Sequence, residues 1–386
     1  MKIAVLNDTP AKLAPDKSGM GPERRVAATP DTVRAYAGDG HSVVVVKGAG
    51  KASDFPDAAY AEAGASLAAS NAAAAKSADL VLSVGAGSPA LAKAMRKGAG
   101  FVGVMSATDH PDTVAAFARA GVSALALDWI PRISRAQSMD VLSSQSNLAG
   151  YRAVVEAASH YGRAFPMMMT AAGTVAPAKV FVMGAGVAGL QAIATARRLG
   201  AVTTATDVRP AAKEQVASLG AKFVAVENEE FRAAETAGGY AKQMSAEYQA
   251  EQAALTASHI AKQDIVVTTA LIPGRAAPVL VTKEMLATMP AGAVVVDLAA
   301  ERGGNVEGVE PGKVVTTDGG VTLVGHTNWA SRMPGDASRL FARNVKALMP
   351  LLVAEDGTFT PDWDDEIVRG ALVTRGGEVV HERLAS

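Results

Sequence analysis

Residues 179–207 read KVFVMGAGVAGLQAIATARRLGAVTTATD, and this stretch decides the fold of the second half of the chain. Residues 180–183 form a short apolar run that is typical of a buried strand. Three glycines with the spacing GxGxxG follow it: Gly184, Gly186 and Gly189. An alanine-rich stretch then extends to Gly200, and a second strand-like run over 202–206 ends at Asp207. The order predicts a strand, a tight turn, a helix and a second, parallel strand.

The binding of a dinucleotide explains the glycine spacing. Gly184 permits the tight turn, Gly186 lets the backbone approach a pyrophosphate, and Gly189 lets the helix pack closely on the sheet. The helix N-terminus then offers free N–H groups and the positive end of its dipole to the phosphates. With strand, helix and acidic residue all present, the pattern favours a dinucleotide site over a glycine-rich turn that binds nothing.

Asp207 predicts which dinucleotide binds. It stands about 20 residues beyond the glycines, where an acidic residue accepts hydrogen bonds from the adenine-side ribose. A carboxylate there repels a 2′-phosphate, so we expect NAD(H) in preference to NADP(H). Arg209 acts in the opposite direction, because an arginine can receive a 2′-phosphate.

Composition excludes several classes of function. The 386 residues include 37 basic and 38 acidic side chains, so nothing suggests binding to a nucleic acid or an anionic membrane. The absence of cysteine excludes disulfides, thiolate catalysis and cysteine-ligated metals. Six histidines lack metal-ligand spacing, and we expect no metal site. No apolar run reaches the roughly 18 residues of a membrane span, and the N-terminus resembles a first strand and not a signal peptide.

Alternating apolar runs and helical stretches predict an α/β fold of two Rossmann-like, doubly wound parallel-sheet domains joined by long helices. We expect the first domain at residues 1–137 plus about 327–386, and the NAD(H)-binding domain at 138–326. Predicted strands lie at 3–6, 43–46, 80–84, 101–105, 124–127, 180–183, 202–206, 222–225, 265–268, 294–297 and 322–324. The long helices are expected at about 138–162 and 336–353.

Four other features carry expectations. Residues 227–255 are polar and lack a strand pattern, which fits either a mobile lid over a ligand or an ordinary helical excursion. Met167, Met168 and Met169 are expected to be packing material. Ala270 and Leu271 follow a strand and are expected to line the cofactor crevice. Asp297 also ends a strand, where it either faces that crevice or caps the next turn.

The polar segment 131–147, PRISRAQSMDVLSSQSN, lies at the predicted domain junction. Its side chains can bind a second ligand, although a capped interdomain helix would also explain them. The stretch 132–151, RISRAQSMDVLSSQSNLAGY, closely resembles the signature of proton-translocating NAD(P) transhydrogenases, in their soluble NAD(H)-binding α subunit. Further similar stretches are FPMMMTAAGTVAPAKV, TDVRPAAKEQVASLGAKF, AETAGGYAKQM, TTALIPGRAAPVL and VGHTN.

The resemblance implies a homodimer that binds NAD(H) and assembles with membrane-embedded and NADP(H)-binding partner subunits. It implies direct hydride transfer between NAD(H) here and NADP(H) on the partner, coupled to proton translocation, on the cytoplasmic face of the inner membrane. It assigns nicotinamide-side contacts, with Gln137 bridging the two nucleotides, to Arg132, Gln137, Asp140 and Ser143. It assigns NAD contacts to Val187, Asp207, Val208, Arg209, Gly239, Gln252 and Leu271, and it places Tyr240 in the family's mobile loop.

Two other functions fit the fingerprint. Alanine dehydrogenase shares the architecture, but it needs a lysine and a histidine near its substrate, where the first domain here has apolar or small residues. A non-catalytic NAD(H) sensor is the third possibility. The polar set of Arg132, Gln137, Asp140 and Ser143 argues against a sensor, which needs no groups facing a second nucleotide.

Overall fold

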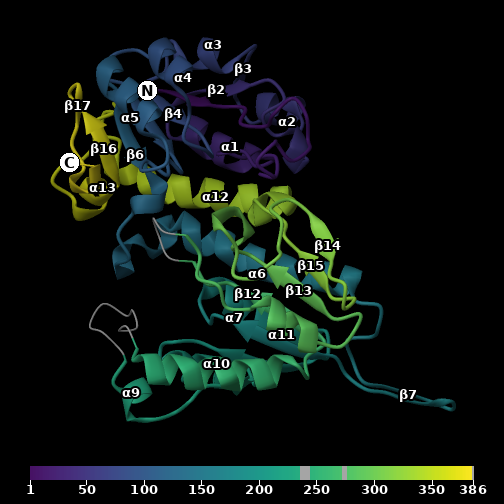
Figure 1. The fold of residues 1–386 in the computed structure, drawn as a ribbon. Helices are drawn as coiled ribbons and strands as arrows, with labels where there is room; N and C mark the ends of the chain where they lie inside the picture. The colour runs from purple at the N-terminus through teal and green to yellow at the C-terminus, as the bar shows by residue number, and fades with distance from the viewer. Residues whose placement is uncertain (235–243, 272–275, 385–386) are drawn as a thin grey trace. The chain divides into compact units, whose positions relative to one another are not determined.

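The computed structural model describes residues 1–234, 244–271 and 276–384 (Figure 1). The chain divides into two compact units. Unit 1 comprises Met1–Leu13, Pro22–Gln145 and Ser331–Ser386, and unit 2 comprises Ala14–Gly21 and Ser146–Ala330. Each unit has its own mainly parallel sheet, which confirms the predicted α/β class with two Rossmann-like domains. The first division falls inside a helix, after Gln145, and not ahead of it at residue 137.

The sheet of unit 1 has eight strands in the order β17-β16-β6-β5-β4-β1-β2-β3. Strands β1 to β6 are parallel, and the C-terminal tail adds β16, antiparallel to β6, and β17, antiparallel to β16. The strands are β1 Lys2–Val5, β2 Ser42–Val46, β3 Ser66–Ala68, β4 Leu80–Leu82, β5 Gly100–Gly103, β6 Ser123–Ala126, β16 Leu372–Arg375 and β17 Glu378–Val379.

Both faces of this sheet are buried, because successive side chains along a strand point to opposite faces. Ile3 and Val5 join one core with Phe341 of α12, whereas Ala4 joins the other core with Phe117 of α5. The helices of unit 1 are α1 Pro30–Gly38, α2 Asp57–Glu62, α3 Asn71–Ala75, α4 Pro89–Ala94, α5 Pro111–Ala120, α12 Pro334–Leu348 and α13 Glu366–Ala371. The predicted long helix at 336–353 is thus α12 followed by a short 3-10 turn, Met349–Leu351.

The sheet of unit 2 has seven strands in the order β11-β10-β9-β12-β13-β15-β14. Only β14 is antiparallel to its neighbour within this described sheet. The strands are β9 Lys179–Met183, β10 Val202–Thr206, β11 Lys222–Phe223, β12 Ile265–Thr268, β13 Val294–Asp297, β14 Val314–Thr316 and β15 Thr322–Val324. Strand order reverses between β9 and β12, and ligands bind outside the carboxyl ends of strands at such a switch point.

Helices cover both faces of this second sheet. Val180 and Val182 pack with Ile193 of α7, and Phe181 packs on the other face with Ile260 of α10. The helices are α6 Val141–His160, α7 Val187–Arg198, α8 Ala212–Ser218, α9 Glu229–Arg232, α10 Ala246–Ile260 and α11 Lys283–Thr288. None of the helices in the described part of the chain is long and apolar enough to span a membrane.

A two-stranded hairpin, β7 Met168–Thr170 and β8 Gly173–Val175, extends away from the sheet of unit 2 (Figure 1). Its methionines are exposed, Met169 by 79%. The expectation that Met167, Met168 and Met169 fill a core is therefore wrong. Because the hairpin projects from the unit, its side chains have no core of that unit to join.

Candidate functional site

The glycine turn after β9 is tightly packed on one side and open on the other. Gly184 has a φ of +103°, and a Cβ there would lie 2.5 Å from Thr269 Oγ1. A Cβ on Gly189 would lie 1.8 Å from the carbonyl oxygen of Gly184. A Cβ on Gly186, in contrast, would meet no described atom within 4 Å. The fold therefore requires Gly184 and Gly189, whereas Gly186 leaves space that a ligand can use.

Helix α7 begins at this open side. Gly186 is its N-cap, has extended backbone, and offers no side chain to accept hydrogen bonds from the first turn. The first backbone hydrogen bond of the helix runs from the Leu190 N–H to the Gly186 carbonyl, 2.8 Å. The N–H groups of the preceding residues have no carbonyl one turn earlier in the helix, so they are suited to binding an anion such as a pyrophosphate.

Asp207 ties the end of β10 to the glycine turn. Its Oδ2 accepts hydrogen bonds from the Ala185 N–H (2.7 Å) and from Arg209 Nη2 (3.0 Å). Its Oδ1 accepts from the Arg209 N–H and from Arg209 Nε, both at 2.9 Å. The Asp207 side chain is only 7% exposed. Because a carboxylate has about four acceptor positions, all of them are engaged in this conformation.

Exposed apolar side chains surround the same switch point. Val187 is 42% exposed, Val208 61% and Leu271 50%. They follow the carboxyl ends of β9, β10 and β12 respectively, at the edge of the sheet where a dinucleotide binds in this fold. Large apolar side chains that remain exposed beside a polar loop provide a surface for flat aromatic rings.

Gln252 joins the ends of two strands from its position on α10. Its Oε1 accepts from the Val226 N–H at 2.9 Å, and its Nε2 donates to Thr206 Oγ1 at 3.4 Å. Val226 lies beyond β11 and Thr206 ends β10, so the amide holds the neighbouring strand ends together. The structure therefore gives Gln252 a structural contact at the predicted crevice.

Ala270 is held by a residue that sequence reasoning missed. The buried Asn305 accepts from the Ala270 N–H (3.0 Å) and donates through Nδ2 to the Ala270 carbonyl (2.9 Å). The same Nδ2 donates to the Pro278 carbonyl, 2.8 Å. Asn305 is 35 residues from Ala270 in the chain, and the turn-like sequence Gly303-Gly304-Asn305 was the one signal that could have drawn attention to it.

Asp297 caps a turn, and this decides between its two expected roles. Its fully buried carboxylate accepts from the Ala299, Asn305 and Val306 N–H groups and from Thr268 Oγ1. Burial raises the pKa of Asp297 above its usual range, although these four hydrogen bonds oppose the shift. The side chain is therefore committed to the β13 turn and not to a ligand.

Gly239 and Tyr240 lie outside the described residues. The elements that flank them, α9 and α10, are helical. The lid over 227–255 stays a prediction.

The polar segment of unit 1 has a fixed backbone and exposed tips. It begins as the 3-10 helix η3, Ser134–Met139, and Asp140 then accepts from the N–H and Oγ of Ser143 at the start of α6. Asn344 of α12 donates to the Ser138 carbonyl at 2.7 Å and accepts from Ser144 Oγ at 2.7 Å. Arg132 and Gln137 are exposed. The segment therefore presents these two side chains from a rigid base.

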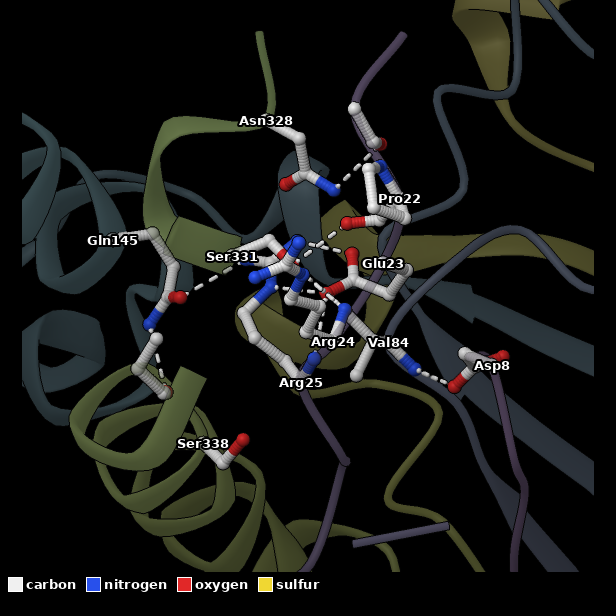
Figure 2. Close-up of polar contacts among 12 residues, drawn as sticks. Asp8, Pro22, Glu23, Arg24, Arg25, Val84, Gln145, Asn328, Ser331 and Ser338 are labelled. Atoms are coloured by element: carbon white, nitrogen blue, oxygen red, sulfur yellow. Dashed lines mark hydrogen bonds and ion pairs between the residues drawn. The ribbon is translucent and has the colours of Figure 1, made fainter. Parts of the chain in front are cut away.

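An ion pair near the chain start anchors the first turn of α6 (Figure 2). Arg25 contacts Glu23 through two parallel bonds, Nε to Oε1 (2.8 Å) and Nη2 to Oε2 (2.7 Å), and donates from Nη1 to Gln145 Oε1 (2.9 Å). Burial acts against the charge of Glu23, but Arg25 and a hydrogen bond from Ser331 outweigh it, so the pKa of Glu23 is below its usual value. Sequence reasoning gave Glu23 and Arg25 no role.

A cavity of about 500 Å³ lies in unit 1, beyond the carboxyl ends of β1 and β4. Its lining consists of Leu6, Asn7, Asp8, Glu23, Asn71, Ala72, Gly85, Ala86, Gly87, Ser88, Ala90 and Leu91. This lining holds two carboxylates and neither a lysine nor a histidine. An amino acid's carboxylate would meet negative charge here, because the nearby Arg25 is already paired with Glu23.

Asp8 is the titratable group of this cavity that stands out. The Val84 N–H donates to its Oδ2, and Ser83 Oγ donates to its Oδ1, both at 2.8 Å (Figure 2 shows the Val84 contact). Burial raises the pKa of Asp8 to about 6 despite these two bonds. Asp8 therefore changes charge near neutral pH.

Comparisons with known proteins agree with this site. The family described as Alanine dehydrogenase/PNT, N-terminal domain, matches residues 19–149, and its C-terminal domain matches residues 153–382. The first of the separate polypeptides that make up NAD(P) transhydrogenase subunit alpha in Rhodospirillum rubrum is 50% identical over 97% of this chain and 98% of its own length. The crystal structure of transhydrogenase from Sinorhizobium meliloti has a TM-score of 0.87 and 51% identity, covering 98% of this chain and 100% of that one.

The alanine dehydrogenase of Bacillus subtilis is more distant, 28% identical over 94% of this chain and 91% of its own length. Near full-length identity of half the residues connects both units, and not the dinucleotide fingerprint alone, to the transhydrogenase relative. The chain therefore belongs to the alanine dehydrogenase/PNT family, on its branch of NAD(P) transhydrogenase α subunits.

Proposed function

We propose that this chain is the NAD(H)-binding subunit of a proton-translocating NAD(P) transhydrogenase. The observation that carries the proposal is the 50% identity with the Rhodospirillum rubrum α-subunit polypeptide over 97% of the chain. A match of that extent includes the polar segment of unit 1 as well as the fingerprint of unit 2. The function then depends on groups from both units.

NAD(H) fits the residues of unit 2. The first turn of α7 and the open side of Gly186 would hold the pyrophosphate, and Val187, Val208 and Leu271 would contact the rings. Asp207 would bind the adenine-side ribose, with the two side-chain donors of Arg209 giving way to its hydroxyls. We infer selectivity for NAD(H), because a 2′-phosphate would lie against the Asp207 carboxylate.

The reaction needs positioning more than acid–base catalysis. Bound NADH supplies a hydride, two electrons with one proton, that passes to the nicotinamide of NADP⁺ on the partner subunit. Arg132, Gln137, Asp140 and Ser143 would orient the reacting rings and keep water away from them. We assign the bridge between the two nucleotides to Gln137, whose carrier segment is fixed by Asn344.

The subunit would act as a homodimer with membrane-embedded and NADP(H)-binding partners on the cytoplasmic face of the inner membrane, where hydride transfer is coupled to proton translocation. The exposed methionines of the β7–β8 hairpin support the dimer, because an apolar projection of this kind is stabilised when a partner covers it. The name of the relative, a subunit made in more than one piece, supports the existence of other subunits.

Alanine dehydrogenase is the less favoured reading of the same fold. Its reaction needs a cationic anchor for the substrate carboxylate and a proton donor at the reacting carbon. The cavity of unit 1 offers Asp8 and Glu23 instead.

Reconstitution tests the proposal. Membranes of the source organism are washed free of this chain and supplied with NADPH and an acetylpyridine analogue of NAD⁺, and analogue reduction is followed with and without the purified protein. We expect activity that depends on adding the chain and is lost when the membranes are omitted. Intact NADH binding without any such activity would overturn the proposal, and oxidation of L-alanine would then be the next assay.

A further inference from the structure

Three potential metal ligands meet in unit 2, away from the glycine turn. Glu156 and His160 lie one turn apart on α6, and His326 follows the end of β15. One ligand atom from each side chain lies within 4.8 Å of the other two. The sequence conceals this group, because the histidines are 166 residues apart (326 minus 160) and the carboxylate does not form a known metal motif with either.

Two of the three groups are held in place. Glu156 is 5% exposed, and Arg152 donates to its Oε1 from Nε (2.9 Å) and Nη2 (2.7 Å). The other oxygen, Oε2, lies 3.7 Å from His326 Nε2. The His326 ring packs edge-on against the ring of Trp329, with centroids 5.7 Å apart. The carboxylate and this imidazole are therefore positioned before any ligand arrives.

His160 provides the adjustable third group. It is exposed at the last residue of α6, so its ring can rotate and an ion can reach the cluster from solvent. A Glu156–His326 ion pair would explain two of the residues but gives His160 no role. Zinc bonds to imidazole nitrogen and carboxylate oxygen are about 2.0–2.2 Å long, so a small inward movement of His160 would complete the set.

We propose that Glu156, His160 and His326 form a binding site for a divalent transition-metal ion, with Zn²⁺ as the natural occupant. Two imidazoles and one carboxylate suit Zn²⁺, Co²⁺ or Ni²⁺ rather than Mg²⁺ or Ca²⁺, which prefer oxygen ligands. Arg152 already balances the charge of Glu156, so binding depends chiefly on the imidazoles. The ion would join the end of α6 to the segment after β15 within unit 2.

Calorimetric titration of Zn²⁺ into the full-length, untagged, chelator-treated protein tests the site. We expect one site per chain, at least a tenfold weaker affinity in His160→Ala and in His326→Ala, and no response to Mg²⁺. His110→Ala, which removes another exposed histidine in unit 1, should bind Zn²⁺ like the parent protein. NADH affinity, measured on every variant, reports whether unit 2 is still folded.

Trp329 provides a second readout that does not depend on activity. Co²⁺ or Cu²⁺ at the site should quench the fluorescence of Trp329 with the same stoichiometry, and the quenching should disappear in Trp329→Phe and in the His160→Ala, His326→Ala double variant. Zinc binding that is equally strong in that folded double variant, or equally weakened by His110→Ala, would overturn the proposal. Because no nicotinamide reaction is measured, this result is independent of the transhydrogenase assay.

Discussion

At the scale of single residues, Asp207 combines two tasks that are separable by substitution. Its carboxylate accepts the Ala185 N–H of the glycine turn and pairs with Arg209. Replacing Asp207 with Ser removes the negative charge and releases the Arg209 guanidinium for a 2′-phosphate. We expect NADH to bind at least 10-fold more weakly, about 1.4 kcal/mol, and the preference for NADH over NADPH to shrink.

Fluorescence titration with both nucleotides measures this change. Asp318→Ser, at an exposed position in the turn between β14 and β15, is the matched control and should bind NADH normally. An unchanged ratio of the two affinities in Asp207→Ser would contradict the assigned role in selectivity.

Gln137 is predicted to act on hydride transfer and not on NADH binding. The side chain is exposed on a segment that Asn344 fixes, so shortening it by one methylene in Gln137→Asn should leave the fold intact. We expect the rate of transhydrogenation to fall at least 10-fold while the Kd for NADH changes less than 2-fold. Gln215→Asn, exposed on α8, should change neither quantity. Equal losses of rate and of affinity in Gln137→Asn would count against the bridging role.

Asp8 predicts a pH dependence of stability. Burial raises its pKa from 3.8 to about 6, so the folded protein holds this proton more tightly than the unfolded chain does. The unfolding free energy contributed by Asp8 is therefore complete below pH 3.8, falls as the pH rises to about 6, and is constant above it. The loss is at most about 3 kcal/mol, because one pKa unit corresponds to about 1.4 kcal/mol.

Asp8→Asn removes this titration. The asparagine can accept from the Val84 N–H through its oxygen and donate to Ser83 Oγ, so both contacts of Asp8 persist. Urea unfolding at pH 4 and at pH 7 should show a smaller difference in the variant than in the parent protein. An identical pH difference in the two proteins would show that Asp8 does not carry the shift.

At the scale of elements, the turn from β9 into α7 separates a glycine needed for ligand binding from one needed for folding. Gly186→Ala adds a Cβ that meets no protein atom within 4 Å at a φ of −75°, which alanine readily adopts. We expect a near-normal melting temperature but at least 10-fold weaker NADH binding, because the methyl group occupies the space left for the pyrophosphate.

Gly189→Ala should behave in the opposite way. Its Cβ would lie 1.8 Å from the Gly184 carbonyl oxygen, so the helix must shift and stability should fall by about 1–3 kcal/mol. Calorimetric melting and NADH titration of both variants measure the two effects. Normal NADH affinity in Gly186→Ala would remove the pyrophosphate from this turn.

The same turn shows how far the sequence could predict the structure. The fingerprint was readable because strand, glycines, helix and Asp207 lie within 29 consecutive residues, where local spacing determines the geometry. The contacts of Asn305 with Ala270 and of Asn344 with Ser138 join residues 35 and 206 positions apart, so no local pattern reveals them. The exposed methionines of the β7–β8 hairpin were misjudged for a related reason, since composition does not reveal that a segment leaves its own core.

At the scale of the whole molecule, the β7–β8 hairpin is expected to contribute to self-association. Substituting Met167 and Met169 with Ser removes apolar surface that is exposed within unit 2 and should weaken dimerisation at least 10-fold in sedimentation equilibrium. Leu13→Ser, which removes another exposed apolar side chain in unit 1, is the control. A parent protein that is monomeric, or a dimer that the double substitution does not affect, would contradict this prediction.

The central claim, direct hydride transfer from NADH bound to this chain, is tested most directly by isotope transfer. NADH carrying deuterium at the transferred position of nicotinamide C4 is supplied with NADP⁺ to washed membranes and the purified protein, and the NADPH is analysed by mass spectrometry. The account predicts NADPH that contains one deuterium in ordinary water, formed only when the chain is present. NADPH that carries solvent hydrogen in place of the deuterium would contradict it.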